Sequence, residues 1–180
     1  MAFWTDIVKT PEPLRQYRWY IIFGNQNNLD SIRYALMEAT KPEVEIASMD
    51  HLLLNHSFNY PGVLKWKPMK VKFASVRGEN RDKTKDAATI LHDLVKRGGY
   101  INPKENQTNH INKTSFSQTA FNNTISLVQI DEEGETIEEW KIYNPLITNI
   151  NYGTLSYSSD DIVTIDATIH YDFAELNEKK

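Results

Sequence analysis

The stretch that decides the fold is residues 162–173, which read Ile162-Val-Thr-Ile-Asp-Ala-Thr-Ile-His-Tyr-Asp-Phe173. Apolar and polar residues alternate along it, as is typical of a strand with one buried face and one wetted face. The apolar face comprises Val163, Ile165, Ala167, Ile169, Tyr171 and Phe173, and the polar face comprises Thr164, Asp166, Thr168, His170 and Asp172. A single strand of this length would run about 40 Å, so we expect neighbouring copies to cover part of it.

The chain has 180 residues, of which 40% are hydrophobic. This is enough for one core, so we expect a single domain over residues 1–180, with an N-terminal arm at 1–16, a polar loop at 100–123 and a flexible tail at 177–180. The absence of cysteine excludes disulfide frameworks and thiolate metal sites. Because the sequence shows neither a secretory signal nor a long apolar run, we expect folding in a reducing cytoplasm and no membrane anchor.

Charge is unevenly distributed along the chain. Residues 1–130 contain 17 basic and 12 acidic side chains, a balance of +5, whereas residues 131–180 contain 3 basic and 12 acidic, a balance of −9. A protein that binds duplex nucleic acid usually carries a clustered basic stripe, and an acidic C-terminal part would repel phosphate. The pattern therefore disfavours ordinary nucleic-acid binding.

Around the 162–173 stretch, the pattern predicts about seven strands and one helix. The extended segments from which these strands are drawn lie at 17–23, 31–38, 44–49, 51–58, 67–75, 124–130, 135–143 and 145–157, with turns at 60–62, 131–134 and 158–161. The helix is expected at 86–97, where apolar residues recur at helical spacing. Asp86 is placed to cap it, and Gly98-Gly99 to supply a left-handed stop. This arrangement favours a β-barrel or sandwich with a flanking helix.

Connected phrases of the sequence resemble one family. They are Thr40-Lys-Pro-Glu-Val-Glu-Ile46, Leu54-Asn-His-Ser-Phe-Asn-Tyr-Pro-Gly62, Trp66-Lys-Pro-Met-Lys-Val-Lys-Phe73, Trp140-Lys-Ile-Tyr-Asn-Pro-Leu-Ile147, Tyr152-Gly-Thr-Leu-Ser-Tyr-Ser-Ser-Asp-Asp161 and Ile169-His-Tyr-Asp-Phe-Ala-Glu-Leu176. In their order and spacing, over roughly residues 17–176, they resemble the tail tube proteins of contractile-tailed bacteriophages.

The resemblance implies a β-barrel subunit with a flanking helix. Such subunits form homohexameric rings that stack into a hollow tube inside a contractile sheath. The implied partners are further copies of the chain, the tail sheath protein, a baseplate or tube initiator, a tape-measure protein in the lumen, and genomic DNA in transit. The implied location is the virion tail, assembled in the host cytoplasm.

Three sets of residues are candidates for roles in such a tube. On the polar face of the 162–173 strand, Thr164, Asp166, Thr168, His170 and Asp172 are candidates for an acidic lumen wall, along which DNA would not stick. The resemblance implies that the segment containing His51, Leu52, Leu53, Leu54 and His56 joins one ring to the next; the alternative is a strand buried on both faces. Phe3 and Trp4 of the arm are expected to dock on a neighbouring copy or on their own subunit.

Catalytic and metal chemistry find no support in the pattern. His51 and His56 are expected on opposite faces of one strand, without a carboxylate at ligand spacing, so we predict no metal and no cofactor. Glutamates 132, 133, 138 and 139 flank a turn and are interpreted as a solvated charge run rather than paired catalytic carboxylates. No Ser-His-Asp order, phosphate-binding loop or dinucleotide fingerprint is present. We predict a structural protein, not an enzyme.

Two alternatives remain. The first keeps the fold but assigns it to a baseplate tube initiator, a terminal cap, or the tube of a bacterial secretion or injection system. The second is a monomeric barrel that binds a small ligand or single-stranded nucleic acid. Its only support is a set of lysines around the predicted 67–75 strand, namely Lys65, Lys67, Lys70 and Lys72. The same lysines also suit an acidic protein partner such as a sheath.

Overall fold

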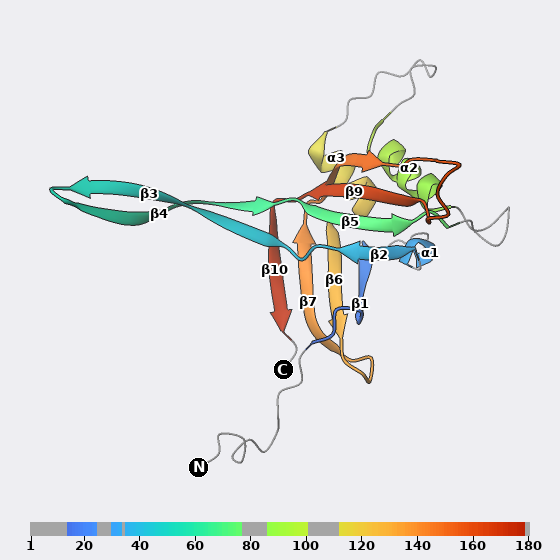
Figure 1. Cartoon of the computed structure of the whole chain (residues 1–180), viewed down its shortest axis with the longest axis horizontal. Coiled ribbons are helices and arrows are strands. Elements are labelled where there is room, and N and C mark those ends of the chain that lie inside the picture. Colours follow the sequence, from blue (N-terminus) through green and yellow to red (C-terminus); the bar gives the residue numbers. More distant parts are fainter. Residues whose placement is uncertain (1–13, 25–29, 34, 77–85, 101–111, 179–180) are drawn as a thin grey trace, which may run out of the picture.

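The computed structural model describes residues 14–24, 30–33, 35–76, 86–100 and 112–178 (Figure 1). The described chain is mainly β. It forms two four-stranded antiparallel sheets and one two-stranded hairpin. Figure 1 shows the hairpin extending far from the body that the two sheets and the helices make.

The first sheet has the strand order β1-β6-β7-β10. Its strands are β1 (Trp19–Phe23), β6 (Thr124–Ile130), β7 (Thr136–Tyr143) and β10 (Phe173–Glu178). The predicted turn at 131–134 connects β6 to β7 and is confirmed. There the Asp131 carboxylate accepts hydrogen bonds from the backbone N–H groups of Glu133 and Glu135, at 2.9 and 2.8 Å.

The second sheet has the order β2-β5-β9-β8. Its strands are β2 (Leu36–Ala39), β5 (Met69–Ala74), β9 (Thr164–His170) and β8 (Leu146–Asn151). Side chains alternate strictly on the central pair, because β5 and β9 each have one face in the core. The buried cross-strand pairs are Met69 with Ile169, Val71 with Ala167, and Phe73 with Ile165.

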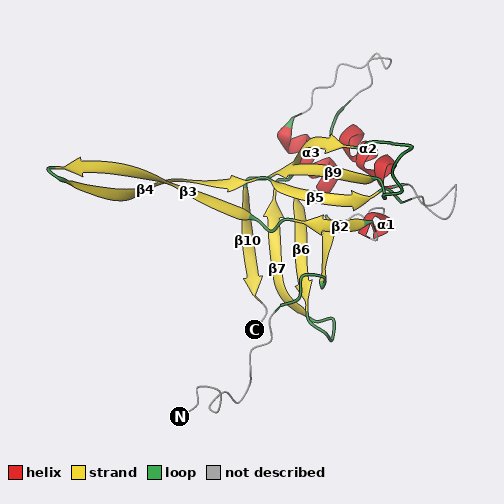
Figure 2. Cartoon of the chain, in the orientation of Figure 1, coloured by secondary structure: helices red, strands yellow, loops and turns green. Residues whose placement is uncertain are grey.

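The hairpin consists of β3 (Glu43–Leu53) and β4 (His56–Lys67). It continues the β2–β5 pair outward, since β3 follows β2 and β4 precedes β5 in the chain. All residues of β3 are exposed. Figure 2 shows the outer part of the hairpin standing clear of the helices and of both sheets, whereas at its base Trp66 of β4 contacts Tyr171, with ring centroids 5.9 Å apart.

In the described part of the chain, three helices accompany the sheets: α1 (Asp30–Arg33), α2 (Ala87–Arg97) and α3 (Lys113–Phe121). The amphipathic helix predicted at 86–97 is confirmed as α2, although the side chain of Asp86 makes no capping hydrogen bond. Its C-terminus is a Schellman motif, in which the N–H groups of Gly99 and Tyr100 bond to the carbonyl oxygens of Lys96 and Val95. The left-handed residue is Gly99 alone, with φ 106°, whereas Gly98 keeps a helical φ of −66°.

The core lies between the two sheets and under α2 and α3. Its members come from every layer of the body: Ile21, Phe23, Met69, Val71, Phe73, Ile90, Leu91, Leu94, Phe116, Phe121, Ile125, Ile142, Ile165 and Ile169. Phe23 of β1 lies 6.3 Å from both Phe73 and Phe121, measured between ring centroids. This aromatic contact ties both sheets to α3.

The predicted single strand over 162–173 is wrong. The chain leaves β9 after His170, passes through Tyr171 and Asp172, and enters the other sheet as β10. In β9 the buried residues are at odd-numbered positions, whereas in β10 the buried residue is Ala174, at an even-numbered position. Phe173, expected in the core, therefore lies outside and stacks on Tyr143, with ring centroids 4.5 Å apart. Switching sheets lets one segment serve both layers of the sandwich.

Several other predicted boundaries need correction. Residues 31–38 contain α1 and β2 rather than one strand, and the predicted loop at 100–123 contains α3; residues 101–111 lie outside the described part. The turn predicted at 60–62 is part of β4, and the strand predicted at 145–157 is limited to β8. The described residues form a sandwich and not a closed barrel. Within the described ranges, no helix is long and apolar enough to cross a membrane.

Candidate assembly surfaces

The hairpin leaves the body through a charged base. The Lys67 ammonium lies 2.6 Å from the Glu43 carboxylate and 3.6 Å from that of Glu45. The hydrogen bond from Lys67 to Glu43 raises the pKa of this lysine, so it stays protonated over the whole neutral range. These pairs are solvent-exposed, and they orient the two strands more than they stabilise them.

At its tip the hairpin exposes three leucines. Leu54 occupies the turn with φ 56°, a left-handed conformation that is unusual for leucine. Leu52, Leu53 and Leu54 are 75%, 57% and 93% exposed. The alternative of a strand buried on both faces is therefore wrong for this segment. Exposed apolar side chains at the end of a projecting arm are typical of a contact with another molecule.

The two histidines of the tip lie on different strands, because the turn falls between them. His51 pairs with Phe58 and His56 pairs with Leu53. Since these cross-strand pairs alternate faces, both histidines are on the same face of the hairpin and not on opposite faces as predicted. His51 also contacts Tyr60 edge-on, at 6.3 Å between ring centroids. Among the described residues, no cluster of three or more His, Asp or Glu could hold a metal ion.

The predicted lumen candidates separate into two groups. Thr164, Asp166, Thr168 and His170 lie on β9 with their side chains directed away from the core; Asp166 and His170 are exposed, while Thr164 and Thr168 are half-buried. Asp166 pairs across the strands with Lys72, and Lys72 lies 3.6 Å from Glu38. The outer face of the second sheet thus carries charges of both signs rather than a uniform negative charge.

Asp172 belongs instead to the junction between β9 and β10. Its carboxylate accepts hydrogen bonds from the Lys113 ammonium and from the Asn144 amide, the latter at 2.9 Å. The bond from Lys113 holds the pKa of Asp172 below its usual value. The backbone N–H of Asp172 also donates to the carbonyl oxygen of Tyr143, at 3.1 Å. Asp172 therefore connects α3, the β7–β8 turn and the sheet crossing.

The four lysines considered for a basic groove do not form one. Lys65 and Lys67 lie on the hairpin, and Lys70 and Lys72 lie on β5, because Pro68 ends β4. Each lysine has a different cross-strand partner. Two of them also form ion pairs, Lys67 with Glu43 at 2.6 Å and Lys72 with Glu38 at 3.6 Å. Single-stranded nucleic acid needs a continuous basic track with stacking aromatics, which these positions do not provide.

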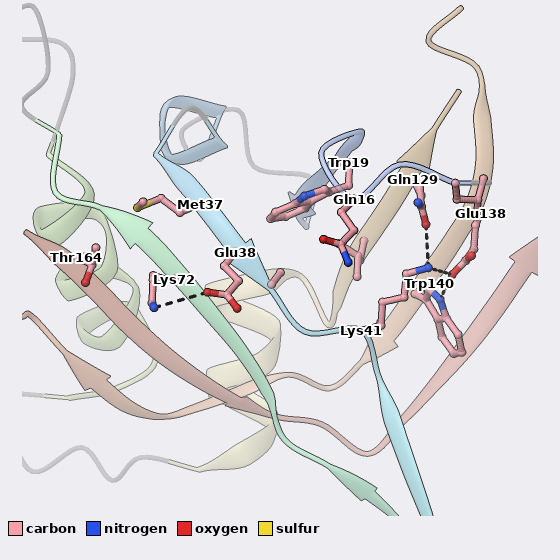
Figure 3. Close-up of a pocket in the computed structure, with 13 residues that line it drawn as sticks. Gln16, Trp19, Met37, Glu38, Lys41, Lys72, Gln129, Glu138, Trp140 and Thr164 are labelled. Atoms are coloured by element: carbon pink, nitrogen blue, oxygen red, sulfur yellow. Dashed lines mark hydrogen bonds and ion pairs between the residues drawn. The ribbon is translucent and has the colours of Figure 1, made fainter. Parts of the chain in front are cut away.

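A groove of about 850 Å³ lies where the two sheets diverge (Figure 3). Its apolar lining includes Trp19, Met37 and Trp140. On its floor the Lys41 ammonium donates to Gln129 Oε1 and to Glu138 Oε1, both at 2.8 Å. Lys41, which follows β2 of the second sheet, thus bonds to β6 and β7 of the first sheet, and these hydrogen bonds hold the two sheets together at the groove.

Sequence reasoning missed the residues that hold these junctions together. Lys41, Lys113 and Asn144 each bond to a partner more than 25 positions away along the chain. No periodicity or motif marks such residues, because their partners are set by tertiary packing. Phe3 and Trp4, the predicted arm contacts, lie outside the described residues.

Comparison with solved structures identifies the same fold in contractile injection systems. The tube-terminating cap of the anti-feeding prophage (AFP) superposes with a TM-score of 0.66 at 14% identity, covering 99% of this chain and 100% of that chain. A chain of the PVC sheath–tube complex in the extended state gives 0.62 at 13% identity, covering 93% of each chain. The PVC sheath/tube terminator gives 0.63 at 15% identity, covering 94% of this chain and 99% of that chain.

No family model and no curated protein matches the sequence. The three structural matches show that the chain has the fold of contractile tail tube and tube-terminator proteins, as the sequence resemblance predicted. At these identities the likeness establishes the fold alone.

Proposed function

We propose that this chain is a structural, self-assembling subunit of the inner tube of a contractile tail. The observation that carries the proposal is the exposed hairpin on a tube-type sandwich. A two-stranded hairpin with both faces in water is at best marginally stable. It becomes stable when another subunit covers its apolar side chains. In this role the subunit performs no chemistry and needs no cofactor or metal.

The sheets offer further contacts for assembly. β1 and β10 are the outer strands of the first sheet, and β2 and β8 those of the second. Unpaired strand edges are templates for pairing with another chain. Edge-to-edge contacts between copies would close a ring, for which we propose six subunits. This arrangement would remove edges that a monomer leaves exposed.

For the lumen wall we propose the outer face of β9, with Thr164, Asp166, Thr168 and His170 facing the channel. Asp172 was predicted as a fifth member, but its contacts with Lys113 and Asn144 point to a structural role at the junction. A channel face with few net positive charges lets a polyanion slide. Genomic DNA and a tape-measure protein are the proposed occupants of this channel.

A charge reversal at Asp166 tests the lumen assignment. The Asp166→Lys variant should fold and assemble, since Asp166 is exposed, but DNA ejection should slow and infectivity should fall. A matched reversal at Glu133, on the exposed β6–β7 turn, is the control. Normal infectivity of the Asp166→Lys particle would exclude a lumenal position.

For ring stacking we propose the hairpin tip, with His51, Leu52, Leu53, Leu54 and His56. Replacing the three leucines by alanine should leave the sandwich folded, because all three are exposed. The variant should stop at rings or monomers, which sedimentation velocity separates from tubes. Tubes of normal length and number from the triple variant would rule out this role for the tip.

A second candidate is a tube terminator or a baseplate tube initiator. It is favoured by the match to the AFP cap, which spans the whole of both chains. The two roles differ in self-assembly, because a terminator should form single rings that do not stack. Further proposed partners are a tail sheath protein and a baseplate, in the tail of a virion or of an injection particle. For Phe3 and Trp4 we propose contacts with a neighbouring subunit.

A further inference from the structure

The hairpin has apolar side chains on different faces in its two halves. We name its faces after Trp66 and Lys67, which are adjacent at the base of β4 and therefore point to opposite sides. In the base half, the Trp66 face is apolar and the Lys67 face is charged. The register places Val44, Ile46 and Leu64 on the Trp66 face, and Glu43, Glu45 and Lys65 on the Lys67 face.

Beyond a bulge the pattern is reversed. Between the pairs Ile46–Leu64 and Ser48–Pro61, β3 advances by two residues and β4 by three. The extra residue shifts all later residues of β4 to the opposite face. On β3, which alternates without interruption, the apolar residues change from even positions (Val44, Ile46) to odd positions (Met49, Leu53), and the shift in β4 brings its apolar residues to the same face. The tip half therefore has Met49, His51, Leu53, His56, Phe58 and Tyr60 on the Lys67 face, and Ser48, Asp50, Leu52, Ser57, Asn59 and Pro61 on the Trp66 face. The edge-on contact of His51 with Tyr60 agrees with this assignment.

The bulge depends on a glycine. A Cβ atom at Gly62 would lie 2.9 Å from the carbonyl oxygen of Ala47 on the opposite strand. This is closer than real Cβ contacts occur, so the backbones can approach here only without a side chain. The change of face is thus built into the strand pair.

The ribbon also turns over along its length. In Figure 1, β4 lies above β3 next to the body and below β3 near the tip. Two-stranded ribbons twist strongly, and a bulge increases the twist. The turnover reverses which face of the ribbon points to a given side of the molecule. Because the apolar side chains of both strands also change face at the bulge, the two reversals cancel.

We propose that the hairpin presents one continuous apolar stripe along a single side, and that this stripe binds along the surface of a second copy of the chain. The stripe comprises Val44, Ile46 and Leu64 near the base and Met49, Leu53, Phe58 and Tyr60 near the tip. All seven are exposed in the single chain. The four charged side chains at the base and the Ser, Asp and Asn side chains of the tip lie on the opposite side with Leu52, whereas His51 and His56 lie on the stripe side.

The size of the stripe fits a protein partner. Its exposed area is on the order of 700 Å², close to the ~800 Å² that each partner buries in a standard interface. A subunit whose stripe stayed uncovered would tend to aggregate, so the molecule that covers the stripe must be present in an amount equal to this chain. A second copy meets that condition without any other protein. The inference rests on the proposed function and deepens it by assigning one side of the arm to the contact.

Two adjacent residues of β4 test the stripe directly. Phe58 lies on the stripe and Asn59 on the other side, so Phe58→Cys and Asn59→Cys form a matched pair. The chain has no native cysteine, so each variant carries a single thiol. Maleimide labelling is measured on free subunits and on assembled particles. Assembly should slow labelling of Phe58→Cys by about tenfold or more and that of Asn59→Cys by less than about twofold. Ile46→Cys and Glu45→Cys repeat the comparison at the base.

Serine variants supply a measurement that does not depend on labelling. Phe58→Ser should raise the subunit concentration for half-maximal assembly by at least about tenfold, whereas Asn59→Ser should raise it by less than about twofold. Equal effects at the two positions, or full labelling of Phe58→Cys within tubes, would overturn the one-sided stripe and leave the tube proposal intact. Failure of the unmodified chain to assemble at all would overturn both proposals.

Discussion

Gly98 offers the sharpest stability prediction, because the side chain that an added methyl group would strike, Phe116, is itself held in place by a further ring. A Cβ atom at this position would lie 1.9 Å from Cδ2 and 2.2 Å from Cε2 of Phe116 on α3. Ordinary carbon contacts are ~3.5–4.0 Å, so α2 and α3 would have to separate by more than about 1 Å. Phe116 is buried and packs against Phe121, at 6.1 Å between ring centroids, so its ring cannot move away freely.

The expected cost of Gly98→Ala follows from two opposing effects. Overpacking of this kind costs about 1–3 kcal/mol. The helical φ of −66° suits alanine, which recovers about 0.4–1 kcal/mol through the unfolded state. The net loss should be about 1–2 kcal/mol, or a fall in Tm of about 2–8 °C for a chain of this size. Urea unfolding followed by circular dichroism, below the assembly concentration, should show a lower midpoint with an unchanged slope.

Gly134→Ala is the control for this argument. Its φ of 85° penalises alanine through the backbone, by about 1–2 kcal/mol, and a Cβ atom there would meet nothing within 4 Å. A Phe116→Leu background should therefore reduce the loss caused by Gly98→Ala and leave that of Gly134→Ala unchanged. Stability equal to the unmodified chain in Gly98→Ala, or no coupling to Phe116→Leu, would refute the reasoning.

Three further predictions concern stability. Gly153→Ala should lower the free energy of unfolding, measured by chemical denaturation, by about 1–3 kcal/mol more than Gly134→Ala does. Both glycines have positive φ, but only a Cβ atom at Gly153 would meet a backbone atom, the Thr164 oxygen at 2.5 Å, so equal losses would contradict this. The lowered pKa of Asp172 stabilises the fold above the ordinary carboxyl range near 4 and ceases to do so as the pH falls through the lowered value. Asp172→Asn should therefore be less stable at pH 7 by about 0.5 kcal/mol, with the difference vanishing in acid; a difference that grew in acid would show the wrong sign. Phe23→Ala should lose about 3–5 kcal/mol through its contacts with Phe73 and Phe121, whereas the fully exposed Tyr157→Ala should change stability by less than about 0.5 kcal/mol; comparable losses in the two variants would contradict the core assignment.

The sequence predicted the elements with strong local patterns. Alternation located β5 and β9 and helical spacing located α2, because each has one face in the core, and the turn at 131–134 located β6 and β7 on either side of it. The break at Tyr171 and Asp172 left no mark in the pattern, since apolar residues continue to alternate across it. The backbone bond from Asp172 to Tyr143 and the change of sheet are tertiary effects.

The hairpin shows a related limit of sequence reasoning. Its strands are rich in apolar residues, a feature that suggested burial, yet in the single chain they are exposed. In the proposed tube, a second subunit would cover this surface. The tip candidates were identified through the family resemblance, and the lumen candidates through alternation alone, so only four of those five share one strand.

The most direct test of the tube assignment is electron microscopy of the purified, untagged chain over a range of concentrations, with and without a baseplate nucleus. The account predicts hollow particles whose end-on class averages have six-fold symmetry, either as stacked tubes or as rings. A strictly monomeric species at every concentration, with or without the nucleus, would contradict it.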